Sequence, residues 1–141
     1  NTESCDAQLE GVVLEFVSAP DGKVYASYAL GAAGSVLKSQ ERLVVGSALV
    51  IEGLPEGTLS LPLKPAGLQN GPDAVRLVFD GSVLDALAYE GVVPNASEGA
   101  FAKADTGDLA LARCRDGFDT QDNANDFQLT TPTPGLPNAC E

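Results

Sequence analysis

The segment from residue 116 to residue 126 carries the side chains best suited to chemistry in this 141-residue chain. Its four carboxylates are those of Asp116, Asp119, Asp122 and Asp126. Ca²⁺ prefers clustered oxygen ligands, and crowded carboxylates are destabilised when no cation lies between them. The spacing differs from that of an EF-hand, which has oxygens at alternating positions and a Gly at the sixth. The four residues are therefore candidate calcium ligands, and no other cofactor is indicated.

The same segment also fits a purely structural role. Asp, Asn and Thr side chains often bond to the backbone of their own turn. In that interpretation Phe118 and Phe127 anchor the turn to the hydrophobic core. The sequence leaves both interpretations open.

Catalysis is not indicated by the residue types present. The chain has no His, which is the commonest general base, the usual zinc ligand and the centre of Ser-His and Cys-His nucleophile pairs. It also lacks the GxSxG, phosphate-loop and dinucleotide-binding motifs, and no carboxylate pair stands out as that of a glycosidase. We expect a protein that is not an enzyme.

The charge balance restricts the kind of partner. Twenty acidic and eight basic residues give a formal net charge of -12. Binding to nucleic acid or to an anionic membrane surface depends on Lys and Arg, so both are disfavoured, and cations or basic partners fit better. The longest nearly apolar run, residues 43–51, is far shorter than the roughly 20 residues of a membrane helix. We expect no membrane insertion.

The three cysteines, Cys5, Cys114 and Cys140, lack the CxxC spacing of zinc and redox sites. Cys114 and Cys140 bracket a loop-rich segment that a covalent closure would stabilise by roughly 3 to 4 kcal/mol. We predict a disulfide between them, with Cys5 left over. A Cys5–Cys114 bridge and three reduced cysteines are the alternatives. A disulfide would place the protein outside the cytoplasm, secreted or in the cell envelope.

The elements that must position these residues are predicted to be strands. The apolar segments are short, rich in Val and Leu, and separated by Gly, Pro and Asp about every ten residues, as in all-β sandwiches and barrels. Asp-Gly turns predict two hairpins, 12–17 with 24–30 and 74–79 with 83–89. Shorter strands are predicted at 42–45, 48–52, 59–63 and 109–112. Without a linker or repeat, residues 1–141 are predicted to form a single domain of about seven to nine strands.

Asp85 interrupts an apolar face of the strand predicted at residues 83–89. Alternation puts Val83, Leu87 and Tyr89 on the same face. A carboxylate there must be hydrogen-bonded or paired with a cation. A structural tie to a loop backbone or to Arg76 is the simpler interpretation, and contact with a ligand is the alternative.

The C-terminal segment resembles the end of the lamin tail domain as it occurs in secreted bacterial proteins. Arg113 precedes a loop with Asp-Gly, Asp-Thr, Asp-Asn and Asp-Phe pairs over residues 116–127, and a TPG..N ending follows at residues 133–138. Residues 68–91 resemble the central hairpin of that family, and residues 1–17 and 43–51 resemble earlier elements. The resemblance implies an immunoglobulin-like β-sandwich that binds or assembles with other proteins.

The chain departs from the family pattern at its N-terminus. Family members have one or two further strands before the Asn that matches Asn1, and a Trp where this chain has Val12 or Val13. The chain starts at Asn1 and contains no Met, so we expect that an upstream piece was removed. A sandwich without its first strands would have an open sheet edge and a gap in its core, which an extended peptide can fill.

These observations predict a non-catalytic, extracellular or envelope-associated module for protein interaction or assembly. Its missing strand would come from a cleaved N-terminal piece or a partner, or the open edge would cause self-association. Two alternatives stay open. One is a module that binds calcium or carbohydrate through the acidic segment, and the other is an accessory domain of a secreted hydrolase or nuclease.

Overall fold

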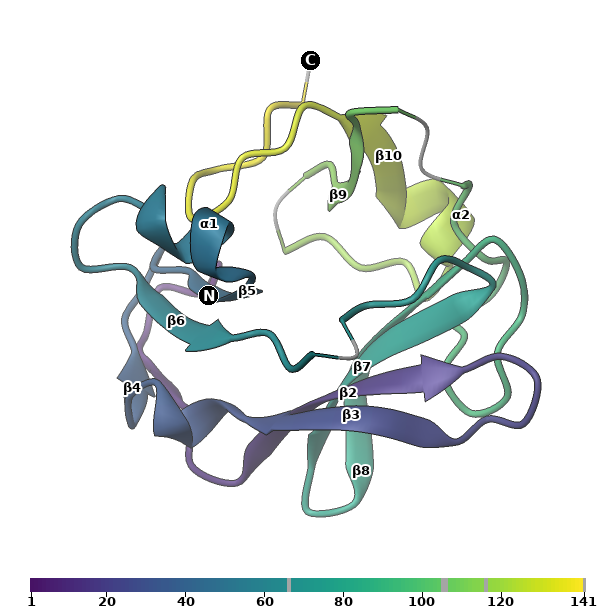
Figure 1. Cartoon of the computed structure of the whole chain (residues 1–141), viewed down its shortest axis with the longest axis horizontal. Coiled ribbons are helices and arrows are strands. Elements are labelled where there is room, and N and C mark those ends of the chain that lie inside the picture. The colour runs from purple at the N-terminus through teal and green to yellow at the C-terminus, as the bar shows by residue number, and fades with distance from the viewer. Residues whose placement is uncertain (66, 105–106, 116, 141) are drawn as a thin grey trace.

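The computed structural model describes residues 1–65, 67–104, 107–115 and 117–140. Its largest element is an antiparallel sheet of four strands in the order β3-β2-β7-β8 (Figure 1). These strands are β2 (Val12–Ser18), β3 (Val24–Ala29), β7 (Asp73–Phe79) and β8 (Ser82–Tyr89). The pairings of β2 with β3 and of β7 with β8 confirm the two hairpins that the Asp-Gly turns predict.

Three pairs of short strands complete the β structure of the described residues. Strand β1 (Ala7–Gln8) pairs with β4 (Val36–Leu37), β5 (Leu43–Gly46) runs parallel to β6 (Leu59–Pro62), and β9 (Ala110–Arg113) is antiparallel to β10 (Phe127–Thr130). In Figure 1 the β5–β6 and β9–β10 pairs lie on the same side of the four-stranded sheet, over its two ends. The all-β prediction is therefore confirmed. The sandwich stays a prediction, because the strands on that side form separate pairs rather than one sheet.

The prediction of a strand at residues 48–52 is wrong. This segment is the helix α1 (Ala48–Glu52), whose N-cap is Ser47. The Ser47 hydroxyl accepts a hydrogen bond from the Val50 N–H at 3.4 Å, which satisfies a donor at the start of the helix. A short apolar run can form a buried strand or a turn of helix, and the cap favours the helix here. The other helical elements are the 3-10 turn η1 (Leu30–Ala32) and α2 (Asn123–Asp126).

Each face of the four-stranded sheet has its own core, because side chains alternate along a strand. One face carries large residues, among them Phe16 and Tyr28, whose ring centroids lie 5.3 Å apart. The other face carries small residues such as Val17, Ala74 and Ala88, which pack with Val93 and Ala96. The small side chains let the segment after β8 cover that face closely. Among the described residues no helix is long and apolar enough to cross a membrane.

Candidate functional site: an apolar cleft bordered by an acidic group

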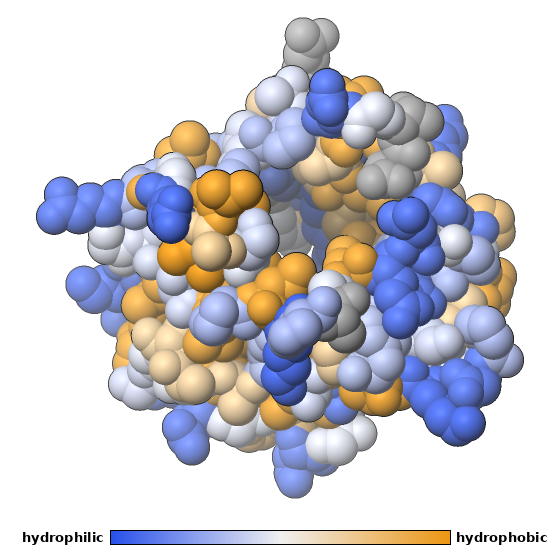
Figure 2. All heavy atoms as spheres, viewed as in Figure 1, coloured by the Kyte–Doolittle hydropathy of each residue, from blue (hydrophilic) through white to orange (hydrophobic). Residues whose placement is uncertain are grey.

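A cleft of about 530 Å³ opens over the large-residue face of the four-stranded sheet. Figure 2 shows the hollow in the middle of this side of the molecule, with apolar residues on its rim. The cleft is lined by Asn1, Leu14, Phe16, Leu30, Leu37, Arg42, Leu43, Val45, Leu68, Val75, Arg76, Leu77, Asp85, Ala86, Leu87 and Phe127. Most of these residues are apolar, so the cleft suits an apolar occupant.

The floor of the cleft is a sheet face that is covered only in part. Leu14, Val75, Leu77 and Leu87 point from β2, β7 and β8 into the cleft and are only half-buried. Protein interiors are close-packed and contain few voids larger than a water molecule. An apolar cavity of about 150 Å³ holds a benzene molecule, so this cleft has room for roughly three large side chains.

Strands with open edges flank the cleft. Within the described residues, β5 pairs only with β6, and β9 and β10 pair only with each other. Leu43 and Val45 of β5 form one wall, and Phe127 at the start of β10 lies on the other side. The backbone groups of a strand point alternately to its two sides, so each open edge presents donors and acceptors that another strand can use.

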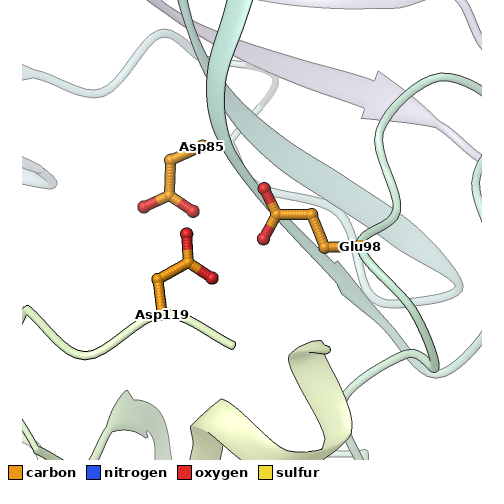
Figure 3. A group of neighbouring side chains, drawn as sticks. All are labelled: Asp85, Glu98 and Asp119. Atoms are coloured by element: carbon orange, nitrogen blue, oxygen red, sulfur yellow. The ribbon is translucent and has the colours of Figure 1, made fainter. Parts of the chain in front are cut away.

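An acidic group of three carboxylates borders the cleft at β8. Asp85 of β8, Glu98 of the following loop and Asp119 of the segment before α2 have carboxylate oxygens within 4.8 Å of one another. Figure 3 shows that these three side chains point toward one another. Asp85 also lines the cleft, so the acidic group and the apolar cleft are adjacent.

Arg113 of β9 lies against all three carboxylates. Its Nη2 is 2.7 Å from Asp85 Oδ1 and 4.0 Å from Glu98 Oε2, and its Nη1 is 3.7 Å from Asp119 Oδ2. The guanidinium also stacks at 4.9 Å from the ring centroid of Phe127, at the wall of the cleft. One positive charge thus faces three negative charges.

The surroundings of Glu98 raise the pKa of its carboxyl. Burial raises the pKa of the Glu98 carboxyl, and the nearby Asp85 and Asp119 charges raise it further. The Ala86 N–H and the Arg113 guanidinium act in the opposite direction and do not cancel the effect. The environment of Glu98 therefore disfavours the charged form of this carboxyl.

The structure also corrects the predicted partner of Asp85. Its carboxylate pairs with Arg113 rather than with Arg76, whose Nε donates to Glu15 Oε2 at 2.8 Å. Leu77 lies opposite Asp85 in the sheet, so Asp85 and Arg76 project from opposite faces. The requirement for a partner follows from the sequence, but its identity depends on the position of β9.

The four predicted calcium ligands do not all come together among the described residues. Asp119 belongs to the acidic group, whereas Asp122 is the N-cap of α2 and accepts from the Ala124 N–H at 3.1 Å. Asp126 is buried and accepts from the Thr120 N–H at 3.0 Å and the Thr120 hydroxyl at 2.6 Å. Asp116 lies outside the described residues. Asp122 and Asp126 thus tie the turn to its own backbone, as the structural interpretation predicts.

The pKa of Asp126 reflects these bonds. Burial alone would raise the pKa of the carboxyl, but the Thr120 hydroxyl and N–H and the Asp122 N–H hold it below its ordinary value.

The two phenylalanines that are predicted to anchor the segment differ in burial. Phe127 is half-buried at the cleft, whereas Phe118 is 51% exposed, so the prediction that Phe118 anchors the segment in the core is wrong.

Asn123 fixes the acidic segment to β8, a role that the sequence does not reveal. This residue is fully buried. Its Oδ1 accepts from the Ala88 N–H at 2.8 Å, and its Nδ2 donates to the Ala86 carbonyl at 2.7 Å. Nδ2 also lies 3.3 Å from Glu98 Oε2, and Glu98 Oε1 accepts from the Ala86 N–H at 3.0 Å. The side chains of Asn123 and Glu98 thus bond to the backbone groups at the edge of β8 that a neighbouring strand would otherwise pair with.

The predicted disulfide between Cys114 and Cys140 is confirmed, with the Cα atoms 5.5 Å apart. It joins the end of the chain to the residue after β9 and so holds the C-terminal segment beside the cleft. Cys5 is exposed and forms no disulfide.

Glu98 and Asn123 are the site residues that sequence analysis misses. Glu98 belongs to no motif, and the sequence marks Asn123 only as an amide within the acidic segment and as part of the Asp-Asn pair of the resemblance.

Comparisons of this chain with protein-family models, with curated proteins and with solved structures find no match.

Proposed function

We propose that this protein is a non-catalytic binding module that takes up an extended polypeptide segment as an added strand between β5 and the β9–β10 pair. The segment would lie over the large-residue face of the four-stranded sheet and join the separate pairs into a second layer. The protein would act in assembly or protein recognition outside the cytoplasm, which the disulfide supports.

The observation that carries this proposal is the apolar cleft with open strand edges on both sides. Added strands gain affinity from main-chain hydrogen bonds and specificity from pockets for alternate side chains. The cleft offers both features, because the apolar side chains of Leu43 and Val45 line it and their strand, β5, has an open edge. A net charge of -12 opposes the approach of a second copy, so a different polypeptide is the better occupant.

The relation to lamin tail domains is a further part of this proposal. It is supported by the all-β fold, and by Asn123 and Asp126, which belong to the motif of the resemblance and tie the loop together.

The test is the selection of displayed peptides of about ten residues against the oxidised full chain. We expect enrichment of peptides with alternating apolar residues. Their synthetic forms should bind with Kd values of about 1 to 100 µM. This affinity is expected when the free energy gained by burying two or three apolar side chains is partly offset by the entropy lost when the peptide becomes ordered. On binding, backbone amides of β5 and of β9 or β10 should become protected from hydrogen exchange.

A matched pair of variants locates the binding. Val45→Lys puts a charge on the wall of the cleft and should abolish binding, whereas Leu49→Lys changes an 81% exposed residue of α1 and should leave it unchanged. Thermal unfolding of both variants confirms that they fold. The proposal is wrong if no alternating peptide is selected, or if the selected peptides bind Val45→Lys as well as the original chain.

A further inference from the structure

We infer that the strand taken up by the cleft carries a Lys or Arg that reaches the acidic group of Asp85, Glu98 and Asp119. This inference rests on the proposed function and specifies the chemistry of the partner. It predicts an extended segment whose inward-facing residues are apolar except for one basic residue near β8.

The geometry supports a basic residue at one end of the cleft. Asp85 lines the cleft together with Leu87 and Phe127, and its side chain is 39% exposed. A Lys or Arg of the bound strand can therefore lay its apolar stem over Leu87 and Phe127 and place its charge at Asp85. An apolar residue in the same place would leave the carboxylate without water and without a further cation.

The balance of charge at the β8 end of the cleft points the same way. Arg42 and Arg76 also line the cleft, and Arg76 is paired with Glu15. Asp85, Glu98 and Asp119 bring three negative charges together, and Arg113, which contacts all of them, supplies one positive charge. The chain as a whole carries a net charge of -12, so its long-range field also attracts basic segments. Complementary charge at such a site increases specificity and the association rate.

The experiment starts from an uncharged alternating peptide that binds the cleft. One Lys, and in a parallel series one Glu, replaces each inward-facing residue in turn. At one position we expect the Lys peptide to bind about tenfold more tightly than the Glu peptide. This preference should decrease as NaCl rises from about 0.05 M to about 0.5 M, because salt screens exposed charges.

Variants of the protein assign the preference to the acidic group. Asp85→Asn keeps an oxygen that can accept from Arg113, so it should fold, and it should reduce the preference for Lys to about threefold or less. Asp119→Asn should act in the same direction. Asp21→Asn is the control, because Asp21 pairs with Lys23 in the turn between β2 and β3, and it should leave the preference unchanged.

The outcomes separate the inference from the proposed function. Equal binding of the Lys and Glu peptides at every position, with the uncharged peptide still in the cleft, overturns the inference and leaves the proposed function standing. A preference for Lys that survives in both Asp85→Asn and Asp119→Asn also overturns it. If even the uncharged peptide fails to bind, the proposed function itself is wrong.

Discussion

Replacement of Asn123 by Ala tests how the acidic segment is fixed to the sheet. The Asn123 amide is fully buried and pairs with the Ala88 N–H and the Ala86 carbonyl at 2.8 and 2.7 Å. The Ala side chain can make neither bond. Water cannot readily replace them, because Ala86 and Ala88 are both buried.

The expected magnitude follows from those two backbone groups. A buried donor or acceptor left without a partner costs about 1 to 3 kcal/mol, so the two together cost about 2 to 6 kcal/mol. We therefore expect Asn123→Ala to lower the free energy of unfolding by about 4 kcal/mol. The control is Asn125→Ala in the same helix, where the residue is exposed and the change should be within about 0.5 kcal/mol.

The assay is urea unfolding of both variants at neutral pH with the disulfide intact, combined with amide hydrogen exchange. The Ala88 amide should exchange faster in Asn123→Ala, beyond the change caused by the lower global stability, because its acceptor is lost. A loss of less than about 1 kcal/mol, or equal losses in the two variants, would refute the assigned role of Asn123.

Two further predictions concern the same region. Replacing both Cys114 and Cys140 by Ser should lower the free energy of unfolding by about 3.5 kcal/mol, because the bridge closes a separation of 26 residues. Reducing agent should then no longer change the thermal unfolding of the variant. If the variant and the original chain unfold at the same midpoint temperature, the prediction is wrong. Asp126→Asn should cost about 2 kcal/mol at neutral pH, because the carboxylate accepts two bonds from Thr120. The folded-state pKa of Asp126 is lowered, so the stability that its charge contributes is present above the ordinary value of 3.8 and is lost as pH falls through the lowered pKa. Urea unfolding across that range should show the gap between the two proteins narrowing toward acid, and a constant gap would show that ionisation of Asp126 is not involved.

The sequence by itself determines the local elements of this protein. Asp21-Gly22 and Asp80-Gly81 each join two apolar runs, and both hairpins form where these turns predict them. Such turns act within a few residues, so the chain needs no distant contact to specify them. The Cys114–Cys140 disulfide is also predictable, because the loop that it closes is short and poor in regular structure.

Tertiary structure decides the rest. The segment 48–52 is short enough to suit either a strand or a helix, and the Ser47 cap together with the packing of β5 and β6 selects the helix. The acidic group combines residues 85, 98 and 119, which only the docking of β9 and of the α2 segment against β8 brings to Arg113. The cleft likewise lies between strands that are far apart in sequence. Contacts of this kind depend on how separate elements pack, and no periodicity within one segment encodes them.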